Sequence, residues 1–166
     1  MKKQIYIDLS WIMSKHSGGG NQAANNILDC IIKNNKIVNN FEIYIIARYN
    51  FFKNQKLPRN IKKIYIPNIY YLNFVIRWFL LIFLSNKNYD QIYFCTNIYS
   101  PIFKLNFKIV NIFYDNQWKY YPQNFSSIRL LWIKLNIMLS KIYSDKILCI
   151  SDFIKNEFSK DDKKFV

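Results

Sequence analysis

Short apolar runs alternate with longer amphipathic stretches along the chain, and this alternation constrains the fold more than any other feature. The runs are rich in Ile, Tyr and Phe, as expected for strands covered on both faces. Strands that alternate with helices favour βαβ units and a parallel sheet. We predict strands at residues 4–9, 42–47, 62–66, 91–95, 108–113 and 146–150, with the opening of another at 163–166.

The segments between these strands have helical patterns. Residues 20–34 place Ala24, Leu28 and Ile31 on one face at helical spacing. Ser126 is a suitable N-cap for a long helix, and Ser151 for a final one. In full, the predicted helices cover residues 20–34, 70–85, 126–144, 151–158 and, as a short one, 101–105. Residues 1–166 are therefore expected to form a single α/β domain, a Rossmann-like parallel sheet flanked by helices.

The formal net charge of +14 suggests an anionic partner such as nucleic acid, an acidic membrane face or a phosphorylated substrate. Coding bias towards Lys, Ile and Asn is the alternative explanation. Twenty lysines stand against four arginines, whereas base and phosphate recognition favours the planar arginine fork. We therefore expect no nucleic-acid partner and retain a peripheral membrane contact.

The cysteine and histidine content argues against a metal site. Cys30, Cys95 and Cys149 each lie in an apolar stretch and are expected to be buried, reduced thiols. With His16 as the single histidine, a His/Cys metal centre is not predicted.

The N-terminal segment is too short and polar for a signal peptide, so a cytoplasmic location is expected. The most apolar segment, residues 70–84, is shorter than the ~20 residues of a membrane-spanning helix. It also contains Asn73 and Arg77, which favours a buried or surface-docked helix.

All three glycines stand together as Gly18, Gly19 and Gly20, after the first predicted strand. Ligands of open α/β sheets bind at the carboxyl ends of the strands. Glycine permits positive φ and close approach, and the next helix offers free N–H groups to an anion. The loop fits neither the dinucleotide nor the P-loop pattern. It is either a ligand loop, with His16 and Asn21 as further contacts, or a flexible turn with a solvated histidine.

Two other segments at strand ends have the composition of a binding site. Tyr114, Asp115 and Trp118 follow the fifth strand, where a carboxylate beside aromatic rings is common in sugar sites. The alternative is an aspartate that turns the chain. Ser151, after the sixth strand, is foremost a helix cap and also a candidate for the site edge.

Taken in order, these segments resemble the N-terminal domain of family 4 glycosyltransferases of the GT-B fold. IYIDLS leads into SGGGNQAANNIL, as a strand leads into the glycine loop of the family. Tyr114-Asp115 followed by YYPQNFSSIRLLW is similar to its "HD…P…" segment and long helix. KILCISDFIKNEF is similar to its strand running into "VS-x-F".

The resemblance implies a hexosyltransferase-type enzyme of surface polysaccharide synthesis, at the inner face of the cell membrane. It implies transfer from a nucleotide sugar to a glycan or lipid-linked acceptor, without bound metal or other cofactor. Asp115 is the catalytic candidate. The substrate-binding candidates are His16, Gly18, Gly19, Gly20, Asn21, Tyr114, Trp118 and Ser151.

Two departures from the family pattern limit what carries over. Tyr114 stands where the family often has a histidine, so the role of that histidine is not transferred. The C-terminal, donor-binding half of the fold has no counterpart in the 166 residues. The chain alone is therefore expected to show no transferase activity. The alternatives are a non-catalytic glycan- or anion-binding module and a membrane-associated α/β module.

Overall fold

The computed structural model describes residues 3–12, 19–53, 55, 57–68, 72–85, 90–158 and 165–166. Within them, six parallel strands form one sheet with the order β3-β2-β1-β4-β5-β6, so the predicted α/β parallel sheet is confirmed. The strands are β1 (Lys3–Asp8), β2 (Phe41–Arg48), β3 (Lys62–Ile66), β4 (Gln91–Cys95), β5 (Phe107–Phe113) and β6 (Lys146–Cys149). The order reverses direction between β1 and β4, and ligands of such sheets bind at this switch point.

The helices are α1 (Gly19–Lys33), α2 (Asn35–Asn40), α3 (Tyr49–Lys53), α4 (Asn73–Leu84), α5 (Gln117–Tyr120), α6 (Ser127–Tyr143) and α7 (Asp152–Phe158). The predicted N-cap of α6 is confirmed, because the Ser126 side chain accepts the N–H of Arg129. The predicted short helix at 101–105 is wrong, and this segment is irregular. Five residues gain few helical hydrogen bonds against the cost of nucleating a helix, so a helix this short forms only where its surroundings support it.

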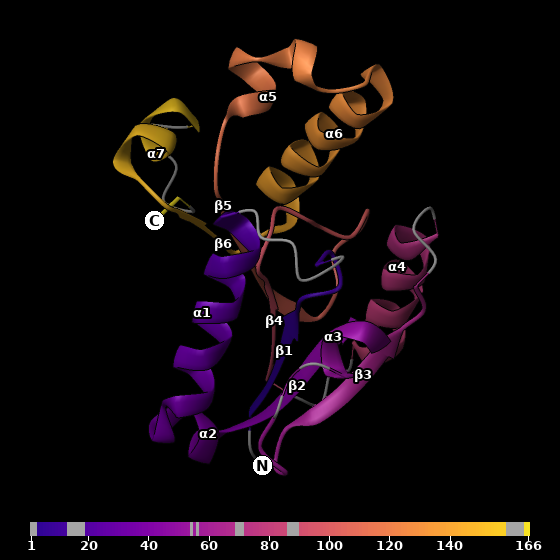
Figure 1. Ribbon diagram of the computed structural model, residues 1–166, viewed down its shortest axis with the longest axis vertical. Helices are drawn as coiled ribbons and strands as arrows, with labels where there is room; N and C mark the ends of the chain where they lie inside the picture. The colour runs from indigo at the N-terminus through magenta and orange to yellow at the C-terminus, as the bar shows by residue number, and fades with distance from the viewer. Residues whose placement is uncertain are drawn as a thin grey trace.

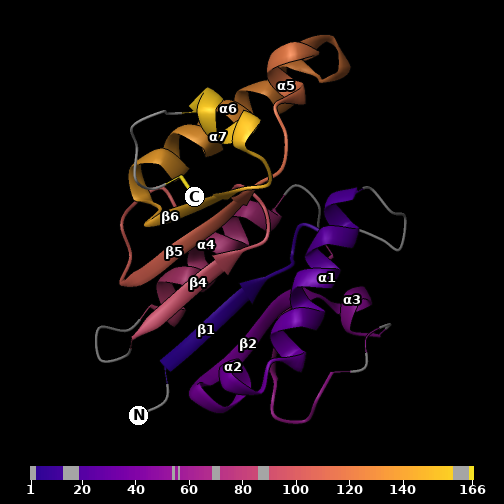
Figure 2. The same cartoon turned by 90° about the vertical axis from the view of Figure 1, so that its left-hand side faces the viewer.

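Helices cover both faces of the sheet (Figure 1). Asp8, Cys95, Asn111 and Ile147 are in register on neighbouring strands and therefore share one face. Arg77 of α4 contacts Asp8, and Ser140 of α6 accepts a hydrogen bond from Asn111, so both helices lie on this face. Helix α1 lies on the opposite face, which Figure 2 shows from the front, with α4 behind the strands.

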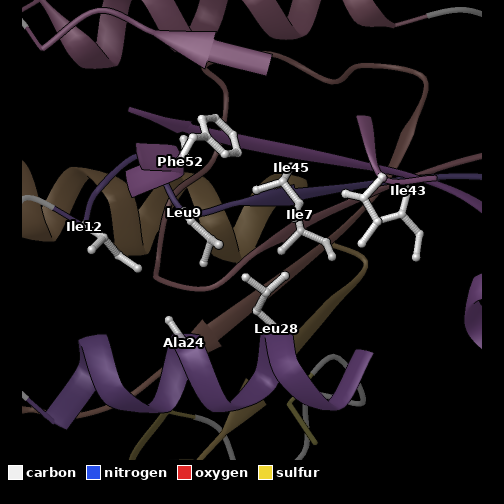
Figure 3. Packing of buried hydrophobic residues seen from close by; sticks show 10 residues of the cluster. Ile7, Leu9, Ile12, Ala24, Leu28, Ile43, Ile45 and Phe52 are labelled. Atoms are coloured by element: carbon white, nitrogen blue, oxygen red, sulfur yellow. The ribbon is translucent and has the colours of Figure 1, made fainter. Parts of the chain in front are cut away.

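The core under α1 shows why this face is stable (Figure 3). Ile7 and Ile45 point from the central strands towards Ala24 and Leu28 of the helix, and all four are buried. Full burial of a Leu or Ile side chain contributes about 1.5–3 kcal/mol. The face of residues 20–34 predicted to be apolar is thus the face that packs.

The last two residues lie beside the edge strand β6. Phe165 forms a parallel bridge with Ile147, and Val166 exchanges backbone hydrogen bonds with Ile147 and Cys149. This pairing agrees with the strand predicted at 163–166, of which residues 163 and 164 lie outside the described part.

The prediction of three buried thiols is only partly right. Cys95 is buried, Cys149 is half-buried, and Cys30 is exposed. Cys30 follows the buried Leu28 by two positions, which turns it about 200° around α1 and towards solvent. Among the described residues, no helix has the length and apolar character needed to cross a membrane.

Candidate functional site

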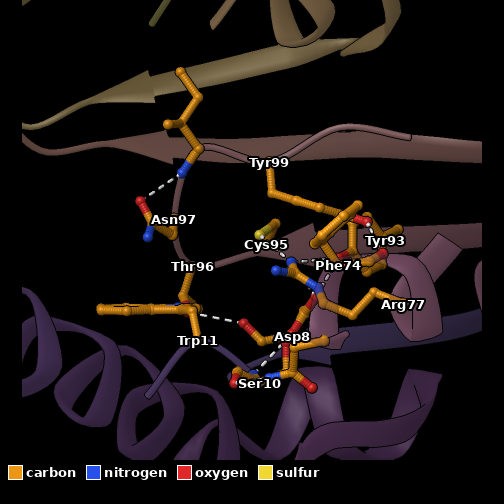
Figure 4. Close-up of polar contacts among 12 residues, drawn as sticks. Asp8, Ser10, Trp11, Phe74, Arg77, Tyr93, Cys95, Thr96, Asn97 and Tyr99 are labelled. Atoms are coloured by element: carbon orange, nitrogen blue, oxygen red, sulfur yellow. Dashed lines mark hydrogen bonds and ion pairs between the residues drawn. The ribbon is translucent and has the colours of Figure 1, made fainter. Parts of the chain in front are cut away.

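The candidate site lies at the carboxyl ends of β1 and β4, on either side of the switch point (Figure 4). Ser10 and Trp11 follow β1, whereas Thr96 and Asn97 follow β4. Tyr114 follows β5, the next strand in the sheet. Because all six strands are parallel, these loops share one edge with the segment after β6 that contains Ser151.

The indole of Trp11 is fixed at this edge by a hydrogen bond to the segment after β4. Its Nε1 donates to Oγ1 of Thr96 over 2.9 Å, and that hydroxyl donates to the carbonyl of Asp8, also over 2.9 Å. The indole centroid lies 6.5 Å from the ring centroid of Tyr114, with 49° between the planes. Two aromatic rings from segments about a hundred positions apart are thus brought together at the switch point.

Gly20 leaves room for this indole at the start of α1. A Cβ at Gly20 would lie 3.3 Å from Cη2 of Trp11, whereas a Cβ at Gly19 would have no neighbour within 4 Å. Gly19 and Gly20 have helical backbone, and no described glycine has positive φ. The predicted left-handed backbone is therefore absent at both, and the function of Gly20 is close approach. His16 and Gly18 lie outside the described residues.

Several buried polar atoms near this edge have no hydrogen-bond partner among the described residues. They include the Tyr114 hydroxyl, Oδ1 of Asn116 and the Ser10 hydroxyl. Burial raises the pKa of Tyr114 to about 12, so its hydroxyl is a neutral donor at physiological pH. Most buried polar atoms in proteins are hydrogen-bonded, so these three can each bond to a ligand or an ordered water.

A buried ion pair between Asp8 of β1 and Arg77 of α4 lies beside the switch point (Figure 4). The carboxylate of Asp8 accepts from Nη2 of Arg77 over 2.5 Å, from the Tyr93 hydroxyl, and from the Ser10 N–H over 2.8 Å. The Arg77 guanidinium also lies 3.5 Å from the Tyr99 ring centroid. These contacts fix the end of β1, and with it the first residues of the candidate loop.

The remaining predicted site residues occupy different environments. Asp115 is exposed and accepts the N–H of Gln117, which is the geometry of a chain-turning aspartate. Ser151 is exposed, and its hydroxyl accepts the N–H of Ile154 as a helix cap. Trp118 is half-buried in the apolar cluster under α7, and Asn21 is half-buried in the first turn of α1.

The structure therefore places Gly20 and Tyr114 each beside the Trp11 indole, and it adds Trp11 and Thr96, which the sequence did not single out. A tryptophan two positions after a predicted strand was the available signal for Trp11. For Thr96 there was none, since its contact joins residues 85 positions apart.

In the described part of the chain, no group of three or more His, Cys, Asp or Glu side chains has the spacing to hold a metal ion.

In comparisons with known proteins, no family, no curated protein and no solved structure matches the chain. The site's residues and geometry are therefore the evidence on function.

Proposed function

We propose that this edge of the sheet binds a sugar, and that the chain is the acceptor-side half of a family 4, GT-B glycosyltransferase. One observation carries the proposal. The Trp11 indole is held at the switch point, beside Gly20 and near Tyr114. Aromatic rings pack against the apolar face of a sugar, and polar groups around them bond to its hydroxyls.

In this proposal the other groups have separate tasks. The Tyr114 hydroxyl and the amide of Asn116 bond to sugar hydroxyls, because both have buried atoms without a partner in the described residues. The first N–H groups of α1 face the donor phosphates, as helix N-termini favour anions. Asn21 and Ser151 contact the substrate from the neighbouring segments.

The reaction moves a hexose from a nucleotide diphosphate to a hydroxyl of a glycan or lipid-linked acceptor. The acceptor oxygen forms a bond to the anomeric carbon, and the bond from that carbon to the phosphate oxygen breaks. The nucleotide diphosphate leaves, and the acceptor proton passes to a base, for which Asp115 is our candidate. A second Rossmann-like domain binds the nucleotide. The enzyme acts at the cytoplasmic face of the membrane.

A non-catalytic glycan-binding module is the second candidate. It uses the same indole and hydroxyls but has no need of Asp115. The observation in its favour is that Asp115 turns the chain into α5, which gives its carboxylate a structural function.

Saturation-transfer NMR on the purified chain tests sugar binding directly. Lactose, maltose and N-acetylglucosamine are the probes, with UDP-glucose and NAD⁺ tested separately. We expect saturation of sugar ring protons, lost in Trp11→Ala and kept in the matched control Tyr65→Ala, an exposed aromatic on edge strand β3. Absence of sugar contacts at millimolar concentration, or equal loss in both variants, would refute the proposal. Saturation of NAD⁺ alone would instead indicate a dinucleotide site.

Transfer separates the two candidates. When the chain is combined with a donor-binding GT-B domain, Asp115→Asn is expected to abolish transfer and leave the saturation of the sugar unchanged. If transfer persists at the wild-type rate, Asp115 is not catalytic. If no combination transfers sugar while binding persists, the non-catalytic candidate is the better one.

A further inference from the structure

A second unassigned feature lies away from the sheet edge, on the outer side of α4 and α6. The largest exposures of apolar side chains in the described residues occur here, with 92% of Phe83 and 82% of Ile128 accessible. Both helices cover the same face of the sheet, and Phe74 of α4 contacts Trp132 of α6, with ring centroids 4.8 Å apart. Their outward sides therefore form one side of the molecule. We call it the α4–α6 face.

Helix α6 contributes a stripe in which apolar and basic residues alternate. Ile128, Leu131, Met138 and Ile142 recur at intervals of three, seven and four, which is one side of an α-helix. All four are exposed, because the opposite side of the helix is the one that packs on the sheet. Lys134 and Lys141 are also exposed and stand a turn away from Leu131 and Met138 on this same side.

Helix α4 adds aromatic side chains to this face. Phe79 and Phe83 lie one turn apart and are exposed, as is Ile82 between them. On its inner side the same helix packs Leu81 and Trp78 into the apolar core, beside the buried Arg77. Apart from its few polar residues, the helix therefore has apolar side chains on both its inner and its outer side, which is typical of a helix with a second apolar environment.

The positive charge of the α4–α6 face indicates an anionic partner. Neither helix contains an Asp or Glu, whereas α6 contains Arg129, Lys134 and Lys141. A surface of exposed Phe, Ile and Leu with interspersed basic groups complements a bilayer with anionic headgroups, where rings and aliphatic chains enter the interface and ammonium groups meet phosphates. The net charge of +14 acts in the same direction over longer range.

We propose that the α4–α6 face docks on an anionic membrane surface, with Phe79 and Phe83 inserted at the level of the headgroups. The inference is independent of the sugar site, because it concerns residues on the outer side of the helices.

Vesicle flotation tests this proposal on the intact chain. The probes are vesicles of phosphatidylcholine alone and vesicles with about a third phosphatidylglycerol. We expect flotation only with the anionic vesicles, weakened by salt. Each lysine near an anionic surface contributes about fivefold in partitioning, so Lys134→Gln/Lys141→Gln lowers it by roughly 25-fold. Phe83→Ser lowers it by roughly tenfold, and retained circular dichroism shows that the fold is intact.

Matched controls lie on the opposite face of the sheet. Lys33→Gln/Lys36→Gln removes the same charge from exposed positions on α1 and α2, and Tyr49→Ser removes an exposed aromatic from α3. Both are expected to float as the wild type does, within about twofold. Equal losses in control and face variants, or no flotation at low salt, overturn the proposal. A dimer that Phe83→Ser dissociates, without vesicle binding, overturns it in favour of a second copy as the partner. Because sugar binding is measured without vesicles, neither failure bears on it.

Discussion

Removal of the Asp8 carboxylate is predicted to destabilise the fold strongly. Only 1% of the Asp8 side chain and 9% of the Arg77 side chain are exposed, so this ion pair is isolated from water. Asp8→Asn leaves the Arg77 guanidinium buried with the Tyr93 hydroxyl, the Cys95 sulfur and the Tyr99 ring, none of which carries the opposite charge. Breaking one side of a buried pair costs about 3–5 kcal/mol. We expect about 3 kcal/mol, since the amide oxygen still accepts hydrogen bonds.

Urea unfolding followed by circular dichroism measures this loss. With a slope of about 2 kcal/mol per molar urea, the midpoint should fall by roughly 1.5 M. Arg77→Met should cost a similar amount, because it leaves the Asp8 carboxylate buried without a cation. The double variant Asp8→Asn/Arg77→Met buries no charge and should be no less stable than either single variant.

Additivity of the two single losses in the double variant would refute the reasoning, because it would mean that the two charges do not stabilise one another. A loss under about 1 kcal/mol in Asp8→Asn would also refute it, since that is the cost at an exposed pair. Thermal unfolding of the same variants supplies an independent check, at roughly 2–4 °C for each kcal/mol in a chain of this size.

Three further predictions concern the candidate loop, the thiols and acid stability. Gly20→Val should weaken sugar binding in the NMR assay because its Cβ meets the indole at 3.3 Å, whereas Gly19→Val, with no neighbour within 4 Å, should not; equal effects would contradict the close approach. Burial raises the pKa of the Cys95 thiol to about 12, so a thiol reagent at pH 8 should label the exposed Cys30 at once and Cys95 only on unfolding; rapid labelling of both would contradict the buried position. A hydrogen bond from the Tyr120 hydroxyl lowers the pKa of Glu157 in the folded protein. The stability that this contact contributes is therefore present above the unfolded pKa of about 4.3 and is lost as the pH falls through the folded pKa. Glu157→Gln should therefore lose less stability than the wild type between about pH 6 and about pH 3, and equal losses would argue against this contact.

The strands could be predicted from the sequence because each is a continuous apolar run whose burial requires a covered parallel sheet. Residues 62–66 and 91–95 were predicted with the bounds that the structure gives. The short helices α2, α3 and α5 were not predicted, since helices of four to six residues have too few residues to show a helical pattern. Helix α2 is an example, in which the Asn34 side chain accepts the N–H groups of Lys36 and Ile37. The sequence contains this capping residue, but the helix predicted at 20–34 ended on Asn34 and so did not leave it as the start of a second helix.

The candidate site was predictable only in part, because strand order is not encoded locally. The segments of Gly20 and Tyr114 could each be placed at the carboxyl end of a strand, but that both lie beside Trp11 depends on β4 and β5 following β1 in the sheet. Trp11 and Thr96 are an extreme case, because the hydrogen bond between them depends on which strand becomes the neighbour of β1. The ion pair could not be predicted either. Arg77 in an apolar run favoured a buried or surface-docked helix, but its partner, Asp8, lies 69 positions earlier.

Helix α4 connects the two proposals physically. Arg77 ties its inner side to the end of β1, and the Phe74 carbonyl accepts from Tyr99, which lies beside the same ion pair. Phe83 is six residues further along and exposed, so about 9 Å of helix separates its position from that of Arg77. A protein docked on a bilayer through the outer side of α4 would hold the end of β1 on the inner side of the same helix, one helix diameter of roughly 10 Å from the headgroups. In the proposed transferase, that placement would bring the site within reach of an acceptor anchored in the membrane, so a lipid-linked acceptor is the first one to test.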